Sequence, residues 1–119
     1  QLLLAVPTRR FDRGVTYRAY AMFLFDPKGV AGQPFRVWRY AGSAATGSEN
    51  SAACEDGTVQ PCFDNAGTVA FERDAGTGLP RLRVARTGTE ISGPGQVRQL
   101  GAADEVVYRL DGDRARFVQ

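Results

Sequence analysis

The chain has 119 residues, of which 43% are hydrophobic and 24% are charged, and its formal net charge is +2 at pH 7. This length and composition predict one folded domain over residues 1–119 with a modest core, and they exclude general disorder. Nearly all the basic residues are arginines scattered among acidic residues. No basic stripe is present, so we expect no nucleic-acid partner, and nucleic-acid binding is the least favoured function.

Histidine is absent from the chain. Its absence excludes the usual general base near neutral pH, the Ser-His and Cys-His nucleophile pairs, and zinc sites that use imidazole. The carboxylates Glu72 and Asp74 could be imagined as an acid and a base, but they lie in a strand-to-turn segment where solvated side chains are expected. We therefore expect a protein that is not an enzyme, with no catalytic residue and no cofactor.

A short apolar run begins the chain and comprises Leu2, Leu3, Leu4 and Val6. The run is too short to span a bilayer, so contact with a membrane is expected only through a segment that precedes Gln1. These side chains either pack in the protein's own sheet or pair with a neighbour's exposed edge, which makes them candidate interface residues. Pro7 argues against a helix here. If residues 1–12 nevertheless continue a helix, the fold is α+β.

Residues 15–25 (VTYRAYAMFLF) form the clearest predicted strand. The odd positions are all apolar, and the even positions become apolar in the second half, which is typical of a strand covered on both faces at one end. A proline-containing turn at 26–29 ends this strand. A second strand is predicted at 34–41, where Trp38 and Tyr40 share one face and are further candidate interface residues.

Residues 42–66 are small, polar and acidic, and they predict a long loop, which in a compact domain is usually functional or mobile. The loop carries four carboxylates of the kind that calcium prefers, namely Glu49, Glu55, Asp56 and Asp64. These four residues are candidates for cation binding, with calcium as the ion. No EF-hand spacing is present, and the alternative is an ordinary solvated loop.

The only two cysteines, Cys54 and Cys62, lie in the same segment. Their spacing is too wide for a CxxC redox motif, and two thiolates are too few for a closed zinc site. The Asp56-Gly57 turn and Pro61 let the chain fold back, so we predict a disulfide that pins the loop. Closing a ring of about nine residues stabilises the fold by roughly 2.6 kcal/mol. A disulfide predicts a periplasmic, extracellular or cell-surface location; free cysteines in a cytosolic protein are the alternative.

Strand patterns resume after this segment at residues 68–73 and 82–86, and a short strand is expected at 96–100. The C-terminal segment, EVVYRL-DG-DRARFV (105–118), predicts two strands joined by Asp111-Gly112, the strongest short hairpin signal. We therefore predict a mainly β fold, an antiparallel sheet or sandwich of about seven strands.

The C-terminal half resembles a known family. The segment ADEVVYRLDGDRARF (103–117) looks like the closing hairpin of minor pseudopilins and minor type IV pilins, and TVAFERDAGTG followed by LRVARTGTEISGPGQVRQL is similar to strands in the heads of these proteins. The family's N-terminal cleavage site and long apolar helix are not in this sequence. The resemblance implies a non-enzymatic head domain that packs against neighbours in a pilus or secretion pseudopilus.

The leading hypothesis is an exported structural subunit of a surface filament or secretion apparatus, whose partners are other protein subunits in a homo- or hetero-oligomer. The alternative is a small secreted binding module or inhibitor that presents residues 42–66 to a ligand. Deletion of residues 1–6 combined with light scattering distinguishes the two hypotheses, because only the first requires association between subunits.

Overall fold

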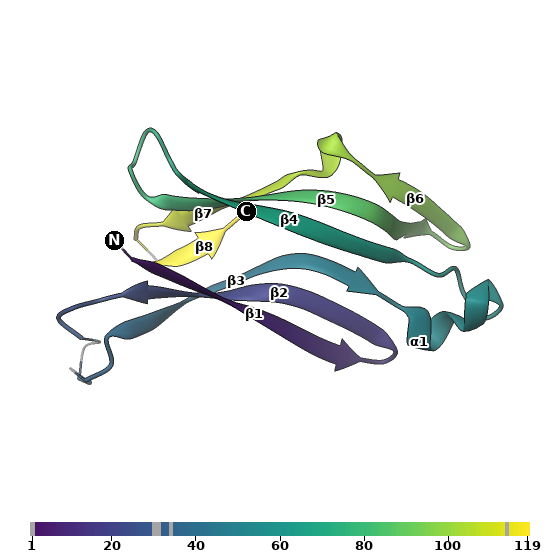
Figure 1. Cartoon of the computed structure of the whole chain (residues 1–119), viewed down its shortest axis with the longest axis horizontal. Coiled ribbons are helices and arrows are strands. Elements are labelled where there is room, and N and C mark those ends of the chain that lie inside the picture. Colours follow the sequence, from purple (N-terminus) through teal and green to yellow (C-terminus); the bar gives the residue numbers. More distant parts are fainter. Residues whose placement is uncertain (1, 30–31, 34, 114) are drawn as a thin grey trace.

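The structure is a computed structural model that describes residues 2–29, 32–33, 35–113 and 115–119. These residues form eight strands in one antiparallel sheet (Figure 1). The strands are β1 (Leu3–Asp12), β2 (Val15–Phe25), β3 (Trp38–Glu49), β4 (Asp64–Arg73), β5 (Pro80–Gly93), β6 (Gln96–Leu100), β7 (Val106–Asp111) and β8 (Arg116–Val118). A short helix, α1 (Ser51–Cys54), and two 3-10 turns, η1 (Glu55–Gly57) and η2 (Ala102–Asp104), complete the described chain. The predicted mainly β, antiparallel fold is confirmed.

The sheet bends sharply between β3 and β4. Its strand order is β1-β2-β3-β4-β5-β7-β8, with β6 added to β5. β3 pairs with β4 only at its far end, through Ser48 with Asn65 and Glu49 with Asp64, whereas β4 pairs with β5 from Asn65 to Arg73. Beyond this narrow junction the sheet turns back, so that β1–β2–β3 form one layer and β4–β5–β7–β8 a second layer facing it (Figure 1).

Glycines allow the close approach of backbones at this bend. A Cβ on Gly47 of β3 would lie 2.4 Å from the carbonyl oxygen of Asn65, and a Cβ on Gly88 of β5 would lie 2.2 Å from that of Asp64. Gly88 also has a φ of +102°, a conformation that L side chains rarely adopt. Only glycine fits at both positions, because any side chain would push the neighbouring strand away.

The core lies between the two layers. Met22 and Leu24 of β2 meet Leu82 and Val84 of β5, and Phe117 of β8 packs against them. All of these side chains are buried. Because side chains alternate along a strand, the even positions of β2 face the core while its odd positions face away from it. The apolar odd positions of the predicted strand at 15–25 therefore form a different surface.

The helical alternative for the N-terminal segment is wrong. Leu3–Asp12 forms strand β1, which pairs with β2 along its whole length. The Phe25 N–H donates to the Leu2 carbonyl, so by the antiparallel alternation the even residues of β1 bond to β2. Pro7 then faces the outer edge of the sheet, where its missing N–H removes no ladder bond. Gln1 lies outside the described residues.

The predicted loop at 42–66 is wrong in its extent. β3 continues to Glu49, helix α1 and turn η1 follow, and β4 begins at Asp64. Small residues such as Ala44 suggested a loop, but Ala44 is fully buried in the core. Within the described residues of this segment, only Asn50 and residues 58–63 lie outside a strand or helix.

Two further boundaries differ from the sequence-based expectation. The strand predicted at 34–41 begins only at Trp38, and Phe35 is 80% exposed in the connection before it; Pro34 lies outside the described residues. The C-terminal hairpin exists, but β8 begins at Arg116, which pairs with Asp111. The connection is therefore longer than the two-residue Asp111-Gly112 turn that was predicted. The predicted strands at 15–25 and 96–100 are confirmed.

Candidate functional site

The face of β1–β2–β3 that is turned away from the core, which we call the outer face, carries apolar side chains over part of its length. Strand register places side chains in rows across the three strands. The two most apolar rows are Leu2–Phe25–Trp38 and Leu4–Phe23–Tyr40. The next row, Val6–Ala21–Ser43, is smaller. The outer face is thus aromatic and aliphatic at one end.

The aromatic side chains of these rows pack against one another in pairs, and the rows are partly exposed to solvent. The rings of Phe25 and Trp38 are 5.2 Å apart between centroids, and those of Phe23 and Tyr40 are 5.6 Å apart, both edge to face. Trp38 is 38% exposed, Leu4 43% and Tyr40 46%. Contiguous exposed apolar patches are typical of interaction surfaces, whereas single scattered apolar residues are common on any protein surface.

The structure places most of the candidate interface residues on the outer face. Leu2, Leu4, Val6, Trp38 and Tyr40 lie there. Leu3 is the exception, because it points inward and packs, partly buried, against the core. The alternation along β1 separates it from its two neighbours.

The solvent-facing side of the second layer has the opposite character. Glu72 of β4 accepts hydrogen bonds from Arg81 at 2.8 Å and from Arg83 at 3.0 Å, both on β5. The bonds from Arg83 and then Arg81 hold the pKa of the Glu72 carboxyl below its ordinary value. Arg83 also pairs with Glu105. One layer therefore presents paired charges to solvent, while the other presents apolar rings.

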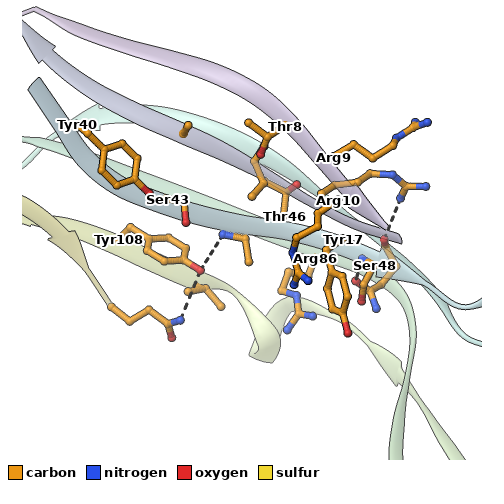
Figure 2. Close-up of a pocket in the computed structure, with 18 residues that line it drawn as sticks. Thr8, Arg9, Arg10, Tyr17, Tyr40, Ser43, Thr46, Ser48, Arg86 and Tyr108 are labelled. Carbon is orange, nitrogen blue, oxygen red and sulfur yellow. Dashed lines mark hydrogen bonds between the residues drawn. The ribbon is translucent and has the colours of Figure 1, made fainter. Parts of the chain in front are cut away.

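A groove of about 690 Å³ opens beside the polar end of the outer face. Its lining includes Tyr40, Ser43 and Tyr108 toward one end and Arg10 and Arg86 toward the other (Figure 2). The groove thus runs past the edge of β3 and is bordered by residues of both layers. It contains the arginines Arg9, Arg10, Arg18 and Arg86, and no Asp or Glu is among its described lining residues.

At one position on the edge of β3, a backbone N–H is already hydrogen-bonded to a side chain of the second layer. The Ala45 N–H donates to the Tyr108 hydroxyl at 3.2 Å, and the Gln119 amide nitrogen donates to the same oxygen at 3.5 Å (Figure 2). Tyr108 itself is buried in the core and reaches β3 from β7. Its hydroxyl takes the position that a neighbouring strand's carbonyl would otherwise fill.

The four carboxylates considered for calcium are placed in different elements. Glu49 ends β3 and accepts hydrogen bonds from the Ser51 hydroxyl and the Ser51 N–H, which lower the pKa of the Glu49 carboxyl. Glu55 and Asp56 lie in η1, and Asp64 begins β4. No group of three or more acidic, cysteine or histidine side chains suited to a metal forms in the part of the chain that the structure describes.

The predicted disulfide is confirmed. The Sγ atoms of Cys54 and Cys62 lie at bonding distance, 2.05 Å, and the Cα atoms are 5.3 Å apart. The bond joins the end of α1 to the segment before β4. It therefore pins the connection between the two layers rather than an isolated surface loop.

Several residues of this region were not anticipated from the sequence. Phe23 and Phe25 were recognised as apolar strand positions, but not as part of an exposed face. The groove arginines come from β1, β2 and β5, so no local pattern brings them together. Their only sequence signal is the interleaving of arginine with aromatic and apolar residues, which is equally typical of an ordinary strand face meeting water.

The chain was compared with protein-family models, curated proteins and solved structures, and none of them matches it. Among the described residues, no helix has the length and apolar character needed to cross a membrane.

Proposed function

We propose that this protein is a non-enzymatic subunit of an exported assembly, and that copies of the chain associate through the outer face. The observation that carries this proposal is the contrast between the two layers: ion-paired charges cover one, whereas Leu4, Trp38 and Tyr40 leave an apolar patch on the other. Burial of such a patch removes apolar surface from water and favours association.

The face, and not the edge, is the contact surface in this proposal. β1 is the edge strand of its layer, and an edge strand can pair with another chain. Pro7 lies in the middle of that edge and lacks the N–H that a continuous ladder needs. Strand addition along the whole of β1 is therefore disfavoured, which leaves side-chain packing on the outer face.

The charge and size of the protein set the expected strength of association. A net charge of +2 produces only weak repulsion between copies. Three strands of about ten residues present a flat projection of about 480 Å², whereas a stable interface buries roughly 800 Å² per partner. We therefore expect association that is weak between two copies and that strengthens when each subunit has several neighbours, as in a filament.

The disulfide supports the proposed location. A bond between Cys54 and Cys62 is consistent with an oxidising compartment, and we propose the periplasm or the cell surface. The filament or secretion apparatus suggested by the resemblance to minor pilins and pseudopilins is the kind of assembly that such a subunit would join.

Light scattering over a concentration series tests this proposal. We expect the mean mass to rise with concentration for the native chain, and to stay monomeric in a Leu4→Gln/Trp38→Gln variant that keeps its far-UV circular dichroism. Val97→Gln is the matched control, because Val97 is exposed to a similar extent, 41%, on β6. A native chain that is monomeric at every concentration would contradict the proposal.

Ligand binding is the second candidate function. Ser43 and residues 45–48, which lie in the segment predicted from the sequence to be a ligand-presenting loop, line the groove together with residues of β1, β2 and β7. If the protein binds a ligand here, side chains of strand β3 contact it, and not the loop that was predicted from the sequence. The chemistry of the groove indicates what kind of ligand would fit.

A further inference from the structure

The groove brings together cationic side chains from both layers. Arg10 of β1 and Arg86 of β5 lie at the same end of it, beside Tyr17 (Figure 2). The Arg10 guanidinium carbon is 4.4 Å from the centre of the Tyr17 ring, so the cation lies over that ring. Their carboxylate partners, Asp12 for Arg10 and Glu90 for Arg86, lie outside the described lining of the groove, so an anion in the groove would meet two cationic side chains there.

These arginines are less tightly paired than others in the protein. The distance from a guanidinium nitrogen to the nearest paired carboxylate oxygen is 3.3 Å for Arg10, 4.0 Å for Arg18 and 3.6 Å for Arg86. In contrast, the corresponding distances are 2.8 Å for Arg81 and 2.6 Å for Arg98. Donors of the groove arginines therefore remain available for a ligand, since a guanidinium has five N–H groups in a planar fork.

The rest of the groove is lined by hydroxyl groups, amides and small side chains. The hydroxyls belong to Thr8, Tyr40, Ser43, Thr46, Ser48 and Tyr108, and amides come from Asn65 and Gln119. Ala19, Ala21 and Ala45 leave room between them. The volume of about 690 Å³ lies within the range of roughly 300–1,000 Å³ that is usual for small-molecule sites.

An extended peptide fits this lining poorly. Peptides commonly bind by adding a strand to a free sheet edge, but the Ala45 N–H on the edge of β3 is already bonded to the Tyr108 hydroxyl. A ligand that is itself rich in hydroxyl groups can instead exchange hydrogen bonds with the side chains of the lining.

We propose that the groove binds an acidic sugar of about disaccharide size. Its carboxylate or sulfate group lies between Arg10 and Arg86, and its hydroxyl groups extend along the serine and threonine side chains toward Tyr108. This site gives the ligand class for the second candidate function and does not depend on the assembly function. Tyr40 belongs to both surfaces, but Leu4 and Trp38, whose substitution tests the assembly, do not line the groove, so the two experiments can fail separately.

Isothermal titration of the purified chain tests the site. The probes are a sulfated glucuronate-containing disaccharide, a neutral disaccharide, sodium sulfate and a tetraglutamate peptide. We expect the acidic disaccharide to bind more tightly than the other three, with an affinity that falls as salt is added. Arg10→Gln and Arg86→Gln should each weaken that binding about tenfold or more, since a charged hydrogen bond is lost.

Arg109→Gln is the matched control, because it removes the same charge from the solvent-facing side of the second layer and lies outside the groove lining. Its affinity should equal that of the native chain. If a glutamine variant does not fold, Arg10→Lys and Arg86→Lys replace it, and they should bind more weakly because lysine lacks the planar fork. Equal affinity for sulfate alone, preference for the peptide, binding of the neutral sugar as tight as that of the acidic one, or no binding would each overturn the proposal.

Discussion

Asn50 and Asn65 are buried polar side chains at the junction of the two layers. Asn50 donates to the Pro61 carbonyl at 2.9 Å and accepts from the Phe63 N–H at 2.8 Å. Asn65 accepts from the Ser48 N–H at 3.0 Å. Asn65 also donates to the Thr89 carbonyl at 2.9 Å. Each amide side chain therefore supplies both a donor and an acceptor to the neighbouring backbone, so the bend keeps its hydrogen bonds where the strands separate.

We predict that Asn65→Ala lowers the free energy of unfolding by about 1–3 kcal/mol, because it leaves the Ser48 N–H and the Thr89 carbonyl without their bonds to the Asn65 side chain. Urea unfolding followed by circular dichroism measures the change. Gln99→Ala, which removes an amide from an exposed position on β6, should change stability by less than about 0.5 kcal/mol. Equal effects of the two substitutions would show that the bonds of Asn65 do not matter.

The connection between β3 and β4 is where the chain passes from one layer to the other, and the ladder beside it has only two paired positions. Helix α1 is too short to be stable alone. The disulfide at its end and the bonds of Asn50 restrain this connection instead.

We predict that Cys54→Ser/Cys62→Ser destabilises the protein by about 2.6 kcal/mol, the loop-closure entropy of a ring of about nine residues. Thermal unfolding of the native chain with and without reductant should give the same difference as the double variant. The double variant itself should not respond to reductant. A native chain whose melting temperature is unchanged by full reduction would contradict this prediction.

At the scale of the whole molecule, acid should weaken the fold through carboxylates that are paired in the folded state. The pKa values of Glu72, Asp74 and Asp104 are lowered, chiefly by hydrogen bonds from Arg83, from the Gly76 N–H and from Arg98 respectively. A lowered folded pKa means that the stabilisation is present at neutral pH and is lost as the pH falls through that pKa.

We expect the melting temperature to fall as the pH drops below the ordinary values of 4.5 for Glu and 3.8 for Asp. Glu72→Gln should show a smaller fall between pH 7 and pH 3 than the native chain, because the titrating group is gone. Glu55→Gln, in the exposed turn η1, serves as the control and should follow the native curve. If the melting temperature of Glu72→Gln falls as far as that of the native chain, the charges on β4 and β5 do not contribute to acid sensitivity.

Local sequence patterns were enough to predict the fold class and several of the strands. The alternation at 15–25 predicted β2 with its bounds, and the turn between the cysteines predicted their bond. The same reasoning failed at 42–49, because small residues are common both in loops and where strands lie very close together. Gly47 is such a case, since a Cβ there would meet the Asn65 carbonyl.

Composition and periodicity alone specified an antiparallel β protein without histidine chemistry and with one covalent cross-link, because these properties depend on residue type and short-range spacing. The tertiary structure alone decided which side of β2 is covered. Both sides of its second half are apolar, and the bend between β3 and β4 places the second layer over Met22 and Leu24. Phe23 and Phe25 are thereby left on the outer face, and Arg10 is brought to the same groove as Arg86. Contacts between residues so far apart in sequence depend on how the layers close, which no local pattern encodes.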